Sequence, residues 1–489
     1  MSRAGSGAAL LVAALSARAW AQPPDAPPLE GPAPAESAPL ADTASPSAAA
    51  PTPAVPNLTA APPPEQAPAG PPEPGTPSIK TPRRPSGQIG GDDVAPDDSA
   101  YPHYDNGVVL LPTTDPLKQP FRLKLNHVSQ FKYTNSLATN ETYTDHNGLV
   151  HEVQRRNDIQ LTRDVFYFSG FAFDRRLDFN VLIFTSTATL VATAAGYAGF
   201  VFSRGFALRA GYFSLPSNRA MTGTYPWFHG TDRSLATNYF RPGFTQGVWA
   251  NGEPLPGWNY IAMVGNSLNT LDIKSTNIDN KLAGAVSIWW DHNNFDQFWN
   301  DYEHHDAVAL RLGSAFTFAR EDRLSDLSQA GPENNATFIS DGLFLFETGS
   351  LAPDVTISLA NFYLWAIDGG LKYKGFALNA ELYLRWLNRF AADGPLPVNS
   401  MFDWGFDSSV GYFVVRPLEL FGRSSLVHGP FATGVEGSLG FTWYPFKTRG
   451  VWINAEVAYV SKSPYAGGYY MYSVGQTGIV IPAQFMLRF

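Results

Sequence analysis

Hydrophobic and polar positions alternate through much of the sequence after residue 100. The last twelve residues, 478–489, give the clearest case, because every second side chain is apolar and a mixed set lies between. The apolar set is Ile479, Ile481, Ala483, Phe485, Leu487 and Phe489. Successive side chains of a strand point to opposite faces, so this pattern predicts a β-strand with one continuous apolar face. Such a strand is typical of a transmembrane β-barrel, whose outer face meets lipid.

The same period recurs along the chain. Residues 121–133 place Phe121, Leu123 and Leu125 on one face and Arg122 and Lys124 on the other. We count 16 candidate strands, with the middle of the chain less clear: 121–133, 158–173, 174–187, 197–202, 206–212, 259–264, 281–290, 307–318, 343–347, 356–373, 376–386, 404–415, 417–428, 435–444, 451–460 and 478–489. Bacterial barrels have even strand numbers. The pattern therefore predicts an all-β fold, a transmembrane antiparallel β-barrel of about 16 strands.

One long interruption separates the early strands from the later ones. Residues 214–256 are rich in Pro, Gly, Trp and Arg, and loops of this length are usually functional or disordered. We expect this segment to fold into the barrel and narrow a channel, with Arg219, Arg233 and Arg241 at the constriction. The alternative is an extracellular loop whose arginines pair with acids at the surface.

The chain before residue 101 has a different composition. Residues 1–21 have a short basic start, an apolar stretch and an Ala-Trp-Ala site, which predicts a secretory signal peptide. Residues 22–100 hold 22 prolines and no Phe, Tyr or Trp, so they predict a disordered Pro/Ala-rich periplasmic arm. Residues 101–489 are then the barrel. The arm is expected to act as a spacer, and the alternative is a tether that contacts peptidoglycan or another periplasmic partner.

Composition supports this division. All 67 aromatic residues except Trp20 lie in residues 101–489, yet the mean hydropathy of the chain is only −0.15. An exported, aromatic-rich and Gly-rich chain of this kind is typical of a barrel in the outer membrane of a Gram-negative bacterium. The soluble alternative is a secreted β-sandwich or β-propeller enzyme. The chain has no Cys, which excludes disulfides and thiolate metal sites.

Three further segments carry a family resemblance. They are residues 205–216, residues 417–423 and residues 436–444, the last opening on Glu436 and ending in Trp443 and Tyr444. Their spacing resembles that of the phosphate-selective porins O and P. The resemblance implies a 16-stranded barrel, commonly trimeric, that passes small anions or other small solutes. A terminal Phe, here Phe489, also resembles the assembly signal of outer-membrane barrels.

Charges on the predicted inner face decide whether the anion selectivity that the resemblance implies is expected for this chain. The expected inward bases are Arg122, Lys124, Lys132, Arg311, Arg385, Arg423 and Arg488, and the expected inward acids are Asp178, Glu381, Glu419 and Glu456. An anion filter needs basic side chains with few carboxylates beside them. The sequence therefore predicts a porin for passive diffusion of small hydrophilic solutes, with a preference for anions such as phosphate left open. The alternative is a barrel anchor or adhesin whose arm or outer loops bind cell-envelope partners.

The remaining chemistry-bearing segments predict no catalysis. Residues 291–306 concentrate acids with His304 and His305, which fits a solvated surface loop or a loop holding divalent cations against lipopolysaccharide phosphates. His428 beside Ser424 and Ser425 is the one local pairing that an enzyme would use. We expect no enzyme activity, metal, cofactor or nucleic-acid partner. The expected partners are outer-membrane lipid and lipopolysaccharide, small solutes and two further copies in a homotrimer.

Overall fold

The structure is a computed structural model that describes most of the chain after residue 103. The described residues are 104–111, 120–188, 191–223, 225–270, 278, 280–323, 339–340, 342–465 and 470–489. The expected signal peptide and Pro/Ala-rich arm lie outside them. No helix within the described ranges has the length and hydropathy of a membrane span.

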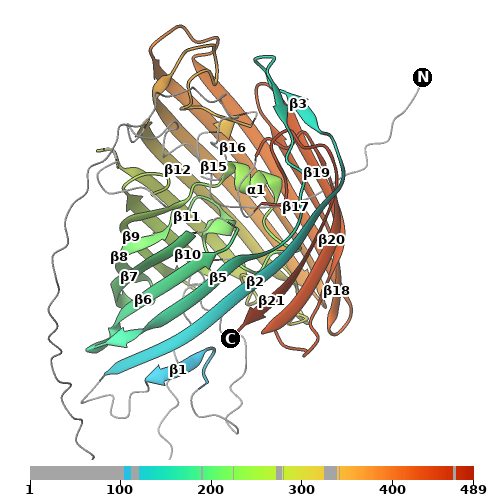
Figure 1. Ribbon diagram of the computed structural model, residues 1–489. Coiled ribbons are helices and arrows are strands. Elements are labelled where there is room, and N and C mark those ends of the chain that lie inside the picture. Colours follow the sequence, from blue (N-terminus) through green and yellow to red (C-terminus); the bar gives the residue numbers. More distant parts are fainter. Residues whose placement is uncertain are drawn as a thin grey trace, which may run out of the picture. The chain divides into compact units, whose positions relative to one another are not determined.

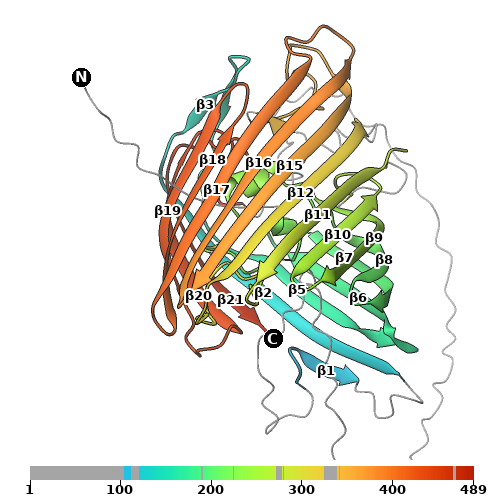
Figure 2. The same ribbon diagram turned by 180° about the vertical axis from the view of Figure 1, so that it is seen from behind.

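Sixteen antiparallel strands of the described chain form a closed barrel (Figures 1 and 2). They are β2 (Phe121–Thr139), β5 (Asn157–Ala172), β6 (Asp174–Ser186), β7 (Val191–Ser203), β8 (Phe206–Ser214), β9 (Phe244–Leu255), β10 (Trp258–Gly265), β11 (Ala283–His292), β12 (Ala309–Asp322), β15 (Ile357–Tyr373), β16 (Phe376–Ala392), β17 (Ser400–Val415), β18 (Leu418–His428), β19 (Thr433–Trp443), β20 (Val451–Ser461) and β21 (Gly478–Arg488). Each strand pairs with the next, and β21 pairs with β2, where Phe485 lies opposite Phe131. The predicted barrel of about 16 strands is confirmed.

Smaller elements lie at the ends and inside the barrel. β1 (Val108–Leu111) pairs with the start of β2, and two short hairpins are formed by β3 (Thr142–Thr144) with β4 (Val150–Glu152) and by β13 (Ile339–Ser340) with β14 (Leu343–Phe344). The 3₁₀ turn η1 (Arg219–Met221) and the helix α1 (Leu235–Phe240) belong to the long connection between β8 and β9. Figure 1 shows α1 within the ring of strands.

The predicted number of strands was right, but one predicted strand was wrong and one real strand was missed. Residues 343–347 supply only the short β14, which pairs with β13 outside the barrel sheet. The missing barrel strand is β9, which lies within the predicted long loop and shortens that loop to residues 215–243. Gly247, Gly252 and Pro254 interrupt the apolar period of β9, so the sequence pattern gives it a weak strand signal.

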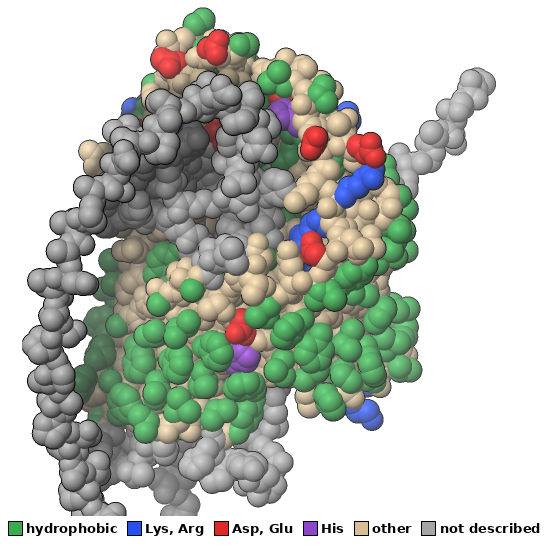
Figure 3. All heavy atoms as spheres, viewed as in Figure 1, with side chains coloured by type: hydrophobic (Ala, Val, Ile, Leu, Met, Phe, Trp, Pro, Cys, Tyr) green, Lys and Arg blue, Asp and Glu red, His purple; other side chains and the backbone are tan. Residues whose placement is uncertain are grey.

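Alternation places apolar side chains outside and polar side chains inside. Leu439 and Val457 are 74% and 54% exposed, whereas their inward neighbours Ser438 and Glu456 are 5% and 3% exposed. The predicted register of the closing strand β21 is also confirmed, because Ile479 and Phe485 are exposed and Val480 is buried. Figure 3 shows apolar side chains gathered over the lower outer wall. This outer surface matches the apolar band that a membrane barrel presents to lipid.

The two ends of the barrel differ in the length of their connections. Most connections at the end that carries Phe489 are tight turns, such as Lys374–Gly375 between β15 and β16, where both residues have positive φ (48° and 84°). This is the backbone of a type I′ hairpin turn, in which Gly is favoured. The opposite end carries the longer loops. Outer-membrane barrels have short turns on the periplasmic side, so the end with Phe489 is the periplasmic end.

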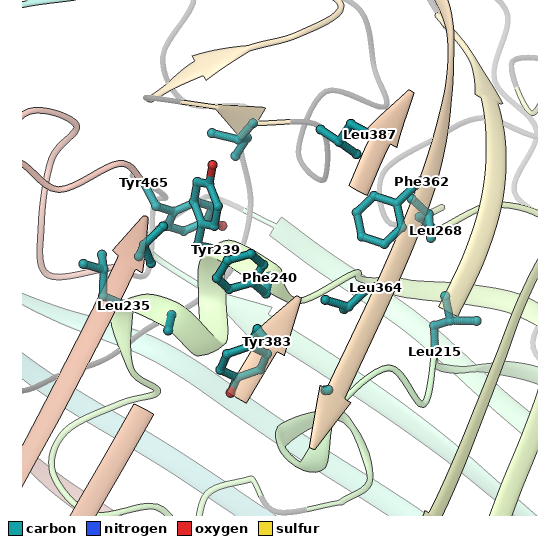
Figure 4. Close-up of a cluster of buried hydrophobic side chains, with 14 of the residues drawn as sticks. Leu215, Leu235, Tyr239, Phe240, Leu268, Phe362, Leu364, Tyr383, Leu387 and Tyr465 are labelled. Atoms are coloured by element: carbon teal, nitrogen blue, oxygen red, sulfur yellow. The ribbon is translucent and has the colours of Figure 1, made fainter. Parts of the chain in front are cut away.

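Apolar packing inside the barrel fixes the connection between β8 and β9 to the wall. The Phe240 ring of α1 stacks on the Tyr383 ring of β16, with their centroids 5.2 Å apart. Figure 4 shows Phe240 of α1 beside Tyr383 of β16, and Tyr239 of α1 beside Tyr465. Burying each such side chain contributes roughly 1.5–3 kcal/mol. The interior therefore has a packed core of its own, with residues 215–243 at its centre.

Candidate channel constriction

Residues 215–243, which we call the lumen loop, cross the inside of the barrel. Among the described residues of this loop, all except Tyr225 and Phe228 are buried. Leu215, at the start of the loop, has 0% of its surface exposed. Ser234 begins α1 by accepting a hydrogen bond from the Thr237 backbone N–H at 2.9 Å, which is an N-cap. The loop thus enters from the extracellular end and is held well inside the ring of strands (Figure 1).

Carboxylates of the barrel wall bind the backbone of the lumen loop. The Arg219 N–H donates to Glu381 of β16 at 2.9 Å, the Thr231 N–H to Glu456 of β20 at 3.0 Å, and the Leu235 N–H to Glu436 of β19 at 2.9 Å. Hydrogen bonds to a carboxylate are stronger than neutral ones. These three strands therefore form an acidic wall whose carboxylates are occupied in holding the loop.

The wall formed by β2 and β5, which the closing strand β21 separates from β20, is basic. Lys132 of β2 and Arg163 of β5 both bind Asp232 of the lumen loop, with N–O distances of 3.1 and 2.6 Å. All three side chains are almost fully buried. Burial opposes ionisation of Asp232, but Arg163 and Lys132 outweigh it and hold the pKa of the Asp232 carboxyl below its usual value. One loop carboxylate thus neutralises part of a cationic wall, and the loop spans both walls.

Arg219 of the lumen loop lies between two aromatic rings. Its guanidinium carbon is 4.9 Å from the Trp299 ring centroid and 5.4 Å from that of Phe295. None of its three guanidinium nitrogens has a hydrogen-bond partner among the described residues. Burial lowers the pKa of Arg219 to about 10, so the side chain stays cationic at neutral pH. This cation is held by ring faces rather than by a carboxylate.

Arg233 and Arg241 lie elsewhere in the loop. The Arg233 guanidinium carbon is 5.1 Å from the Phe228 ring centroid and 5.7 Å from that of Tyr225, and burial lowers the pKa of Arg233 well below its ordinary value. Arg241 donates to the Met221 sulfur at 3.4 Å. The three loop arginines are therefore buried inside the lumen, but each has its own surroundings.

The structure does not bring the predicted wall residues together opposite these arginines. Arg122 and Lys124 lie near the periplasmic end, where Arg122 pairs with the Asp105 carboxylate and Lys124 donates to the Asp105 carbonyl. Three of the other predicted bases have an acidic partner on a strand, whereas Lys132 binds Asp232 of the lumen loop and Arg488 lies over the Trp227 ring. The pairs are Arg311 with Asp368 at 2.6 Å, Arg385 with Asp403 at 2.7 Å and Arg423 with Glu456 at 3.0 Å.

The predicted set of inward side chains left out several acids and three bases, Arg163, Arg209 and Lys372, which are all buried. Asp368, Asp403, Asp407 and Glu436 are buried inward side chains that were not in the predicted set. Asp407 and Glu436 lie at alternating positions that could have revealed them. The inward direction of Arg163 was harder to predict, because β5 has apolar residues on both faces. The pairing of β5 with β2 also shifts register at Gln130 and Phe131.

A second segment enters the lumen from the periplasmic end. Residues 293–308 connect β11 with β12, and Phe295, Phe298 and Trp299 are at most 5% exposed. The Trp299 N–H donates to the Trp227 carbonyl of the lumen loop at 2.9 Å. The expectation of a solvated surface loop or a cation-holding loop facing lipopolysaccharide is wrong, because this segment is periplasmic and its aromatic residues are buried. We call it the periplasmic segment.

The remaining candidate chemistry does not assemble. His428 bonds Thr433 through Nδ1 at 2.7 Å, while Ser425 accepts the Ala236 N–H inside the lumen at 2.9 Å. The two side chains of this predicted pairing thus have separate partners. Across the described part of the chain, no three His, Asp or Glu side chains are grouped as metal ligands would be.

No protein-family model and no curated protein sequence matches this chain. Solved structures of outer-membrane proteins do resemble it. OmpT of Vibrio cholerae aligns with a TM-score of 0.49 and 10% identity over 77% of this chain and 99% of that chain. An anion-selective porin from Comamonas acidovorans aligns with a TM-score of 0.46 and 9% identity over 76% and 100%, and OprB of Pseudomonas putida with 0.42 and 11% over 76% and 94%.

The architecture itself indicates where the protein resides. In a closed barrel every strand has a hydrogen-bonded neighbour on both sides, so the backbone N–H and C=O groups are paired within the sheet. The outer surface of this barrel is apolar where lipid would meet it. An even number of tilted antiparallel strands with short turns at one end is the form of bacterial outer-membrane barrels. The chain is an outer-membrane β-barrel protein of a Gram-negative bacterium.

Proposed function

We propose that this barrel is a porin through which small hydrophilic solutes diffuse passively, with a preference for anions. The observation that carries the proposal is the lumen loop, which crosses a 16-stranded barrel and is fastened to both walls by buried charges. A loop held in this way narrows the passage at a fixed position. Charges near a narrow passage act on a permeating ion more strongly than charges at a wide mouth.

The expected anion preference rests on which carboxylates the loop occupies. Glu381, Glu436 and Glu456 accept hydrogen bonds from the loop backbone, so the loop lies over the acidic wall. The other wall presents Lys132 and Arg163, and the loop adds Arg233 beside them. One carboxylate, Asp232, faces these three cations. The excess positive charge on that side favours anions, and phosphate is one member of this class.

Single-channel recording across a planar bilayer tests the proposal. In a KCl gradient, the wild-type chain should conduct, and its reversal potential should have the sign of chloride preference. Changing Arg219, Arg233 and Arg241 together to Gln should move the reversal potential toward the value for cations. The matched control changes three exposed arginines, Arg175, Arg176 and Arg389, to Gln. Equal reversal potentials for the two triple variants would remove the lumen loop from the selectivity mechanism.

The alternative function is an anchor or adhesin with a filled lumen. The observation that favours it is that the lumen loop and the periplasmic segment enter the barrel from opposite ends and contact each other. A barrel plugged by these two segments would show no steady current in KCl. Steady conductance of the wild-type chain would therefore exclude the alternative.

A homotrimer embedded in outer-membrane lipid and lipopolysaccharide is part of the same proposal. On the outer face of β2 and β5, His127 lies 2.7 Å from Asp164, and Ser129 hydrogen bonds to the same carboxylate. Figure 3 shows an acidic and a His side chain together within the apolar belt. Charged side chains facing lipid are costly, so a cover by a second copy is favoured here. The arm, residues 22–100, is proposed as a spacer, and the alternative is a tether that contacts peptidoglycan or another periplasmic partner.

A further inference from the structure

A cavity lies between the lumen loop and the wall formed by β5, β6, β7 and β8. Its volume is about 100 Å³. Most of its lining is apolar, and the residues used below are Val165, Leu182, Phe184, Ala195, Ala220 and Tyr225. A passage for hydrated ions needs polar walls, because an ion that loses its water must find replacement partners. An apolar cavity beside the proposed constriction is therefore suited to a solute with an apolar part.

One cationic side chain in this lining has donor atoms without a hydrogen-bond partner among the described residues. Arg233 is 5% exposed, and its Nε and Nη1 atoms have no hydrogen-bond partner among the described residues. Its contacts are the faces of Tyr225 and Phe228. A buried guanidinium normally forms charged hydrogen bonds, and a buried donor left without one is unfavourable. Arg233 is thus a donor aimed into an apolar cavity.

Neighbouring acids do not satisfy Arg233. Asp232 is next to it in sequence, but the Asp232 carboxylate accepts hydrogen bonds from Lys132 and from both terminal nitrogens of Arg163. The Arg233 backbone N–H, rather than its guanidinium, bonds Asp232 at 3.1 Å. Arg163 also lines the cavity, and its guanidinium carbon is 5.2 Å from the centroid of the Tyr225 ring. The cavity rim therefore carries excess positive charge.

We propose that this cavity is a binding site for a small monoanion with an apolar body, of the chemical class of aromatic carboxylates. The carboxylate would accept hydrogen bonds from Arg233, and the ring would lie among Val165, Leu182, Phe184 and Ala195. This inference rests on the proposed function and narrows its solute class. The planar guanidinium matches a carboxylate with two parallel hydrogen bonds.

Size and hydration favour this class over a fully hydrated inorganic anion. An apolar cavity of about 150 Å³ in another protein holds benzene, and this cavity, at about 100 Å³, has a volume of the same order. Phosphate, in contrast, has four oxygens that each need donors or water, and the apolar lining supplies few. An aromatic carboxylate places its one anionic group on Arg233 and loses water only from its ring.

Block of the KCl current by benzoate tests the inference on the purified full chain. Acetate has the charge without the ring, and benzyl alcohol has the ring without the charge. Benzoate should reduce the current saturably, at a half-blocking concentration about tenfold or more below that of either control solute. Benzoate that blocks no better than acetate and benzyl alcohol would overturn the inference.

Variants locate the site. Arg233→Gln should raise the half-blocking benzoate concentration by about tenfold or more, as expected for loss of a charge-assisted hydrogen bond. Arg233→Lys should restore part of the affinity, and the exposed Arg389→Gln should behave as wild type. Ala195→Phe should fill the cavity and abolish the block while KCl still passes. Wild-type block in both Arg233→Gln and Ala195→Phe would overturn the assignment.

The outcomes separate this inference from the proposed function. Absence of KCl current in the wild-type chain would contradict the porin proposal itself. A normal KCl current without selective benzoate block would leave the porin proposal standing and remove the aromatic-carboxylate site. Heat-modifiable migration in gels reports folding of each variant, and Ala195→Phe provides an independent test if Arg233→Gln does not fold.

Discussion

Individual residues in this barrel meet opposite requirements on the two faces of each strand. On β16, Leu382 points outward, while Glu381 is 2% exposed and accepts hydrogen bonds from the lumen loop and from the Tyr383 hydroxyl. The sequence period predicts the facing of such residues well. It does not predict what an inward residue touches, because the partners of Glu381 include a loop residue 162 positions away.

Substitutions at these two neighbours should have different effects on the membrane-inserted barrel. Leu382→Arg should lower the free energy of unfolding by about 2–4 kcal/mol if the position lies near the middle of the bilayer. Glu381→Gln should leave insertion intact, since it faces the lumen, and should act on the lumen loop instead. Urea titration of the barrel in lipid vesicles measures both. Equal losses for the two variants would contradict the assigned facing.

The terminal residue is held by more than its side chain. Phe489 exchanges two backbone hydrogen bonds with His127 of β2, at 2.9 and 3.2 Å, and their rings lie 5.2 Å apart. Deleting Phe489 should therefore weaken the last contact of the closing strand and reduce the amount of heat-modifiable barrel in the outer membrane. A chain ending at Arg488 that assembles as efficiently as wild type would show that Phe489 has no role in assembly.

At the scale of elements, the sequence predicts strands better than it predicts connections. Strands with a clear period, such as β16 and β21, were placed correctly, whereas β9 was hidden by its Gly and Pro residues. The lumen loop was recognised by its length and composition. The periplasmic segment was not, because its acids and histidines suggest a solvated loop, and only the fold shows that Phe295, Phe298 and Trp299 meet the lumen loop.

The inward packing of the periplasmic segment should depend on pH. Asp301 accepts a hydrogen bond from His305, with 2.5 Å between the Asp301 Oδ1 and His305 Nδ1 atoms, and this contact raises the pKa of His305 above its ordinary value of 6.5. A group with a raised pKa stabilises the fold below its ordinary pKa, and this contribution is lost as the pH rises through the raised value. We expect slower backbone amide exchange in residues 293–308, after correction for intrinsic rates, at about pH 6 than at about pH 8.

The adjacent His304 has the opposite effect on the pH dependence of this packing, so the experiment needs a control for it. Burial lowers the pKa of His304, so its protonation at low pH disfavours the packed segment. The exchange experiment is therefore made in a His304→Gln background and compared with the same background carrying His305→Gln. If both proteins show the same change in protection with pH, His305 does not control the segment.

On the scale of the whole molecule, one part of the outer surface differs from the rest. The His127, Ser129 and Asp164 cluster lies on β2 and β5, and the nearby half of the outer face of β7 carries the small residues Ala192, Ala194 and Ala198. Small residues allow close approach between membrane proteins, and polar groups hydrogen bond across such contacts. The sequence could not reveal this region, because His127 and Ser129 interrupt an otherwise apolar outer set as if by chance.

Changing the polar cluster should affect association rather than folding. Asp164→Leu removes the charge from the outer face, so each monomer should remain folded while the proposed trimer loses its polar contact. Mild-detergent gel migration of unheated protein and light scattering measure the oligomer. The matched control is Val457→Leu on the exposed face of β20. Equal oligomer content in the two variants would place the contact between copies elsewhere.

Fastening of the lumen loop to both walls has a consequence for how the barrel is made. Asp232 joins the first strands through Lys132 and Arg163, while its neighbour Thr231 binds Glu456 next to the closing strand. The loop thus spans the seam at which the first and last strands must meet. A docked loop would hold these two edges of the sheet close together. Docking of the loop and pairing of β21 with β2 would therefore occur in the same step of barrel assembly. Asp232→Asn should then slow the appearance of closed barrels during biogenesis, and half-closed chains should accumulate on the assembly machinery.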